Sequence, residues 1–280
     1  MADGSGNGRV TAPGVVLGGM LLIVVVISVW LFVSDRYWFP AVASAHGPAI
    51  DGLFMDVLIV TGIAFIAVQG LMAYFVFRFG ENGDERASHW HENAKVEGTL
   101  IAITAVTLTV LVFLGQSVWA SIYFSEPPDD AMIVEVTGQQ FQWVFRYPGP
   151  DGVFGRKDVN MFTETNYIGL DRSDPAGADD IVTLNQMHIV LNRAVRLRLH
   201  STDVIHDFHL PNQRIKQDTV PGMSLEVWFV PTVAGQFEIA CAELCGLGHY
   251  RMKGFLTVDE TEDQFQQWLD EQLEFQTADD

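Results

Sequence analysis

Cysteine and basic residues are both scarce in this chain. It contains only two cysteines, and no C-x-x-C-H motif occurs, so no c-type haem is attached to it. Lys and Arg number 16 against 35 Asp and Glu, which leaves a formal net charge of −19 over 280 residues. Nucleic-acid binding needs a basic surface, and this composition excludes it. The acidity is compatible with docking a basic protein partner or with a saline habitat, and the sequence leaves both open.

Long apolar stretches without charge fill much of the N-terminal half. They are residues 14–33, 57–77 and 99–124. Each is long enough to cross a hydrocarbon core of about 30 Å as a helix. Trp38 and Trp119 lie near the ends of these stretches, as expected of an interfacial aromatic belt. We therefore predict a transmembrane helical hairpin over residues 53–124, joined by the polar loop 80–98.

The N-terminal segment, residues 1–52, allows two interpretations. Its apolar stretch is either a third membrane helix or a cleaved signal peptide, because Ala43-Ser44-Ala45 resembles a cleavage site. That site lies well past the apolar stretch, and the preceding region has a single Arg. We favour a retained helix, so that the anchor has two or three transmembrane helices.

From Ser125 onward the pattern changes to that of short strands. Alternating apolar residues over 132–137 and 194–200 predict half-buried strands, and Gly- and Pro-rich turns separate them. We predict an extracytoplasmic β-sandwich or barrel domain over residues 125–260. Residues 261–280 predict a C-terminal helix with an acidic tail, because a capping-box pattern precedes an apolar helical face.

Both cysteines lie in one short run with the pattern C-x3-C-x3-H-x2-M, formed by Cys241, Cys245, His249 and Met252. Two thiols, an imidazole and a thioether are a soft ligand set typical of copper. A disulfide, a pair of buried free thiols and a zinc site are the alternatives. Zinc sites rarely use Met, and a disulfide needs neither the His nor the Met. Copper is therefore the favoured metal.

A copper site in a β-sandwich usually draws a further His from outside the ligand loop. His206 and His209 both follow a predicted strand, and their spacing does not separate them.

The chain resembles subunit II of the haem–copper cytochrome c oxidases from about residue 53 to 258. The specific matches are residues 201–206, the run Lys216-x-Asp218-x2-Pro221-Gly222, and residues 241–252. The resemblance implies a cupredoxin-like domain with a dinuclear copper A centre. That centre would accept electrons from cytochrome c, whether soluble, membrane-bound or attached in a supercomplex. Subunit I would then receive them at haem and reduce oxygen to water, so no catalytic residue is expected in this chain.

Carried over residue by residue, the resemblance selects His206 as the outside ligand. It implies that Cys241 and Cys245 bridge the two copper ions, while His206 and His249 each bind one. Met252 and the carbonyl of Glu243 would be weak axial ligands. The Glu243 carboxylate resembles a ligand of a magnesium ion shared with subunit I. The implied location is the cell (inner) membrane, as a multi-pass protein with its C-terminal domain on the periplasmic side and with other oxidase subunits as partners.

Three further residues have both a functional and a structural interpretation. Glu97 matches an acid near the entrance of a proton path, but an acid is also favoured in the first turn of any helix. Phe141 aligns with the tryptophan through which electrons enter in the family, and Trp143 matches a second tryptophan. Both aromatic residues could instead be packing residues.

Three other functions remain as alternatives. They are a copper-free quinol oxidase subunit II, a membrane-anchored carrier of a single copper, and a binding domain with a disulfide.

Overall fold

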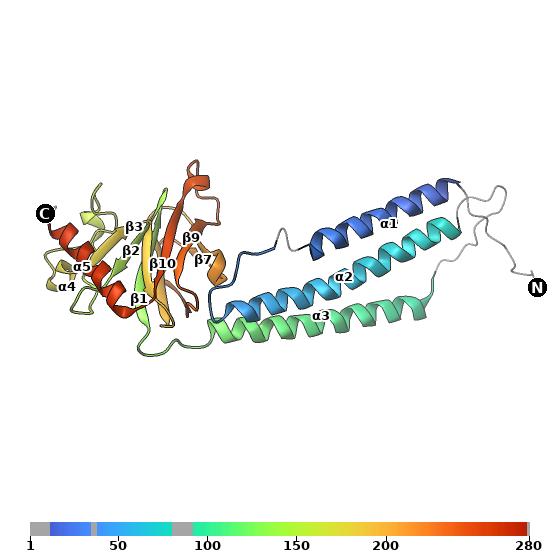
Figure 1. Ribbon diagram of the computed structural model, residues 1–280, viewed down its shortest axis with the longest axis horizontal. Helices are drawn as coiled ribbons and strands as arrows, with labels where there is room; N and C mark the ends of the chain where they lie inside the picture. The colour runs from blue at the N-terminus through green and yellow to red at the C-terminus, as the bar shows by residue number, and fades with distance from the viewer. Residues whose placement is uncertain (1–11, 35–37, 80–91, 279–280) are drawn as a thin grey trace, which may run out of the picture. The chain divides into compact units, whose positions relative to one another are not determined.

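The computed structural model of the chain describes residues 12–34, 38–79 and 92–278 (Figure 1). The described residues divide into two compact units. One contains the residues up to Trp38 and those from Asp51 to Ser117. The other contains Phe39–Ile50 and the chain from Val118 onward.

The three longest helices are α1 (Ala12–Val33), α2 (Gly47–Arg78) and α3 (Ala94–Tyr123). All three are long and apolar enough to span a membrane, as the sequence predicted. Large apolar side chains are exposed along each of them, for example Trp30, Ile63 and Phe113. Such exposure would be unfavourable in water and is suited to lipid. Residues 80–91 of the predicted loop 80–98 lie outside the described residues.

The β-domain consists of two five-stranded sheets. The first has the order β3-β2-β1-β5-β8, and the second has the order β4-β10-β9-β6-β7. The strands are β1 (Met132–Gln139), β2 (Gln142–Tyr147), β3 (Ile181–Leu184), β4 (Gln186–Val190), β5 (Val195–Ser201), β6 (His206–Leu210), β7 (Ile215–Thr219), β8 (Leu225–Phe229), β9 (Gly235–Cys241) and β10 (Lys253–Asp259). This confirms the predicted all-β domain.

Short helices and one longer helix complete the domain. They are η1 (Val159–Met161), α4 (Pro175–Ala178), η2 (Pro211–Gln213), η3 (His249–Arg251) and α5 (Glu262–Ala278). One half of the predicted capping box is present at the start of α5, where the Gln264 N–H donates to Thr261 Oγ1. The Gln264 side chain accepts from the N–H of Glu260, one residue before the expected Thr261. Phe265 and Trp268 of this helix pack beside Tyr147.

The core lies between the two sheets. Alternate residues of β1, β5, β6 and β9 point into it, among them Val134, Leu197, Phe208 and Ile239, all fully buried. Phe145 of β2 adds an aromatic contact to Phe208, with ring centroids 6.2 Å apart.

The opposite face of β1 and β2 carries buried charges. Arg146 of β2 is 2% exposed and donates to Glu135 of β1 at 3.0 Å. It also bonds Asp180 and the carbonyl oxygen of Gly155, which belong to the long irregular segment between β2 and β3. One side chain therefore attaches that segment to the sheet.

Loops from both sheets meet at one end of the domain. β1 and β5 run parallel, and Gly138 near the end of β1 is paired with Ser201 at the end of β5. In the other sheet, Phe208 of β6 is paired with Cys241 at the end of β9. This register brings the β1–β2 turn, the β5–β6 loop and the cysteine loop together.

Candidate metal centre

The two cysteines form the middle of a compact group of donor atoms. Cys241 is the last residue of β9, and Cys245 lies in the loop that follows. Both are buried, and their Sγ atoms are 3.8 Å apart. A disulfide would hold the sulfur atoms at about 2.0 Å, so these cysteines are free thiols.

Other donors surround the two sulfur atoms. Nδ1 of His206 lies 4.0 Å from Sγ of Cys241, and the carbonyl oxygen of Glu243 lies 3.2 Å from it. Sγ of Cys245 is 3.7 Å from Nδ1 of His249 and 3.7 Å from Sδ of Met252. The donor atoms of His206, Cys241 and Cys245 all lie within 4.8 Å of one another.

These separations fit a shared metal. Two donors that each lie about 2.3 Å from one tetrahedral metal are about 3.8 Å apart. The contacts between the sulfur atoms and the side-chain donors measure 3.7–4.0 Å. Thiolate, thioether and imidazole donors favour copper over hard cations such as magnesium.

The two histidines that the spacing left unresolved have different surroundings. His206 begins β6 and is fully buried, and its Nε2 lies 2.8 Å from Oδ1 of Asp203. A metal-binding His typically donates its second ring N–H to a carboxylate, which leaves the other nitrogen, here Nδ1, for the metal. His209 Nδ1 lies instead 3.1 Å from the carbonyl oxygen of Ile215. The donor group therefore contains His206 and not His209.

The two thiols differ in acidity. Burial raises the pKa of Cys241, but hydrogen bonds, first that with His206, outweigh it and bring the pKa to about 6. Burial and the neighbouring charge of Cys241 raise the pKa of Cys245 to about 11. One thiolate therefore forms readily, whereas a second negative charge beside it needs a compensating cation. A positively charged metal between the sulfur atoms would supply that compensation.

The two aromatic residues of the β1–β2 hairpin lie near different parts of the donor group. The ring of Phe141 covers the cysteine loop, and a Cβ added at Gly248 would lie 2.4 Å from it. Trp143 is fully buried, with its ring centroid 6.0 Å from that of His206. Phe141 is thus the outer member of the pair.

The two acidic residues that the sequence indicated, Glu243 and Glu97, lie outside the group of donor side chains. Glu243 is exposed. Glu97 lies in the first turn of α3, where its Oε1 accepts from the backbone N–H of Asn93 at 3.2 Å. That bond satisfies a donor at the helix start, so Glu97 has at least a capping role.

Two polar residues next to the donor group were not predicted, namely Asp203 and Gln140. The sequence offered one signal for Asp203, because a carboxylate that precedes a metal-binding His by one turn can reach its ring. Nothing in the sequence indicated Gln140, since its role depends on how the β1–β2 hairpin folds over the cysteine loop.

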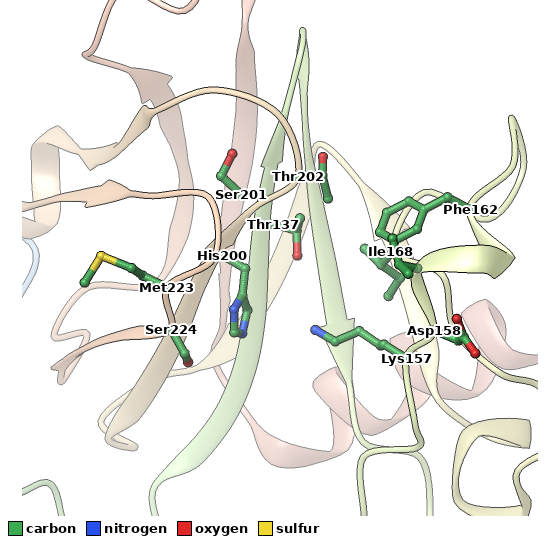
Figure 2. A pocket seen from close by; sticks show the side chains of 12 residues that line it. Thr137, Lys157, Asp158, Phe162, Ile168, His200, Ser201, Thr202, Met223 and Ser224 are labelled. Carbon is green, nitrogen blue, oxygen red and sulfur yellow. The ribbon is translucent and has the colours of Figure 1, made fainter.

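A separate hollow of 360 Å³ lies on the outer side of β1 (Figure 2). Its lining includes Thr137, Lys157 and His200, and none of the predicted copper ligands. Ser201 and Thr202 also line it, and they directly precede Asp203. The hollow therefore borders the segment that orients His206.

The chain is similar to known proteins over most of its length. Residues 132–258 match the family described as cytochrome c oxidase subunit II, periplasmic domain. The alternative cytochrome c oxidase subunit 2 of Bradyrhizobium diazoefficiens is 39% identical over 257 residues, which cover 91% of each chain. The cytochrome c oxidase subunit 2 of Cereibacter sphaeroides is 28% identical, over 79% of this chain and 74% of its own length.

A solved structure of the periplasmic domain of subunit II of cytochrome oxidase from Bradyrhizobium japonicum is also similar. It is 28% identical with a TM-score of 0.39, and the match covers 52% of this chain and 96% of that one. The extent of the match to the B. diazoefficiens protein shows the family, and the chain belongs to the cytochrome c oxidase subunit 2 family of the haem–copper terminal oxidases.

Proposed function

We propose that this chain is the subunit through which electrons enter a cytochrome c oxidase, by way of a dinuclear copper A centre. The observation that carries the proposal is the pair of free thiols 3.8 Å apart, with a His on each side. A carrier of a single copper would leave one of the two sulfur atoms without a role.

Each donor has a role in this proposal. Cys241, Cys245, His206 and His249 would hold the copper ions, with the two thiolates shared between them. Met252 and the Glu243 carbonyl would be weaker ligands that tune the potential. When bound, the copper pair supplies reversible one-electron transfer. The surrounding chain buries His206, Cys241, Cys245 and Met252, so that little rearrangement should accompany a change of charge.

The partners follow from the same function. We infer that cytochrome c delivers electrons and that haem in subunit I receives them. The apolar helices would place the chain in the cell membrane, with the β-domain on the periplasmic side that the matching family's description names. Phe141, the outer aromatic residue over the cysteine loop, is our proposed point of electron input.

The two acidic residues complete the proposal. The exposed Glu243 carboxylate is free to reach a magnesium ion shared with subunit I, because carboxylate oxygens suit that hard cation. Glu97 is our proposed entrance residue of a proton path into subunit I, in addition to its capping bond.

Changing His206 to Asn is expected to disrupt the copper centre, whereas the same change at His209 is expected to leave it intact. Of these two histidines, His206 has its Nδ1 4.0 Å from the Cys241 sulfur, while Nδ1 of His209 lies 3.1 Å from the Ile215 carbonyl oxygen. Copper content per chain and the electron paramagnetic resonance spectrum of the full chain measure the outcome. Wild-type protein should hold two coppers sharing one unpaired electron.

Other outcomes of this experiment would contradict the proposal. Wild-type protein with a single copper would support a mononuclear carrier, and protein without copper would support a quinol oxidase subunit. Loss of the centre in His209→Asn but not in His206→Asn would overturn the ligand assignment.

A further inference from the structure

Gln140 lies at the tip of the β1–β2 hairpin. It donates hydrogen bonds to the cysteine loop and to the β5–β6 loop, which precedes His206. Its side-chain Nε2 donates to the carbonyl oxygen of Cys245 at 2.6 Å. Its backbone N–H donates to Oδ2 of Asp203 at 2.7 Å. Oδ1 of the same carboxylate lies 2.8 Å from Nε2 of His206. One residue therefore connects the cysteine loop to the histidine of β6 through Asp203.

The hydrogen bond from Gln140 holds the loop around Cys245 from outside the loop. Residues 242–248 lie between the end of β9 and η3, so no strand fixes the peptide of Cys245. The ring of the adjacent Phe141 presses on Gly246 and Gly248, where an added Cβ would lie 3.1 Å and 2.4 Å from ring atoms. The hairpin tip thus covers the loop with a ring and holds it with a hydrogen bond.

The position of the Cys245 sulfur follows that of its peptide. If the carbonyl lost its partner, the peptide would be free to rotate about the neighbouring glycine. The contacts of the Cys245 Sγ with Cys241, His249 and Met252, at 3.7–3.8 Å, would then no longer be fixed. Groups that orient metal ligands typically change metal affinity about 10- to 100-fold when they are removed.

We propose that Gln140 is a positioning residue of the metal centre, which keeps Cys245 and His206 at a fixed relative position. The proposal rests on the proposed function, since it concerns the same centre. A Gln that merely stabilised the tip of the hairpin would affect unfolding but would leave the spectrum of the bound metal unchanged.

The test compares Gln140→Met with Gln142→Met in the full chain, purified in detergent and loaded with copper salts. Met preserves the length of the side chain and removes the N–H donor. Gln142 is the matched control, because its Nε2 contacts Gln139 Oε1 at 3.3 Å within the same hairpin. We expect Gln140→Met to bind copper about 10- to 100-fold more weakly in competition with a chelator, with changed hyperfine splitting. Equal affinities and spectra in both variants and the wild type would overturn the positioning role.

A second measurement uses the metal-free full chain. Diamide takes two electrons and two protons from the two thiols, and the sulfur atoms must approach from 3.8 Å to about 2.0 Å to form the disulfide. We expect this oxidation to be several-fold faster in Gln140→Met and unchanged in Gln142→Met. If the wild type bound no copper, the proposed function would fail, yet the oxidation rates would still decide the role of Gln140. Identical rates in all three proteins would refute it.

Discussion

Changing Cys245 to Ser is expected to abolish the proposed two-copper centre and to leave at most one copper in each chain. The Cys245 sulfur contacts three other donors, those of Cys241, His249 and Met252. A hydroxyl is a hard, weakly acidic donor that does not bridge soft metal ions as a thiolate does. We expect oxygen uptake with reduced cytochrome c to fall at least about 100-fold, since loss of a ligand exceeds the loss of a group that merely orients one.

Leu244→Ser is the matched control for this change. It introduces the same residue one position earlier, at an exposed side chain that is not a donor. Copper content, the electron paramagnetic resonance spectrum and oxygen uptake of the assembled oxidase are the measurements. If Cys245→Ser retained two coppers and the wild-type spectrum, the bridging role of Cys245 would be wrong.

The largest effect on stability is expected from Arg146→Met. The guanidinium is buried between Glu135 and Asp180, and it also donates to the Gly155 carbonyl. Met fills a similar volume but leaves Asp180 buried without its counter-charge. Breaking a buried ion pair from one side costs about 3–5 kcal/mol of unfolding free energy. Chemical denaturation of the full chain, followed by near-ultraviolet circular dichroism, measures the loss in the β-domain.

Arg193→Met provides the comparison for Arg146. Arg193 pairs with Glu262, but the two side chains are 38% and 55% exposed, so water screens the pair. We expect its denaturation midpoint to stay close to that of the wild type. A similar shift in both variants would show that burial of Arg146 is not what makes its ion pairs important.

The membrane helices and the strands with a clear apolar pattern were predictable from the sequence. Length and hydropathy alone locate the three helices, and alternation locates β1 and β5. β6 and β7 were missed for a physical reason. β7 reads Ile-Lys-Gln-Asp-Thr and β6 reads His-Asp-Phe-His-Leu, so polar residues interrupt the apolar alternation that marks a strand. Their pairing with each other and with β9, not their own propensity, makes them strands.

The donor residues were more predictable than the residues that orient them. Four soft donors within one short run are visible in the sequence, whereas His206 needed the resemblance to be chosen over His209. Asp203 and Gln140 became evident only in the folded chain. Gln140 and Cys245 are 105 positions apart, and no local pattern reports a hydrogen bond across that separation.

The pairing of the strands also determines when the donor residues can come together during synthesis of the chain. The Cys241 N–H is bonded to the Met252 carbonyl, and β9 pairs with β10, which ends at Asp259. β1 can pair with its parallel neighbour β5 only after that later strand has been synthesised. The donor group therefore assembles only after the chain has been synthesised as far as β10. If the chain binds copper as proposed, the metal would enter once β10 has paired with β9.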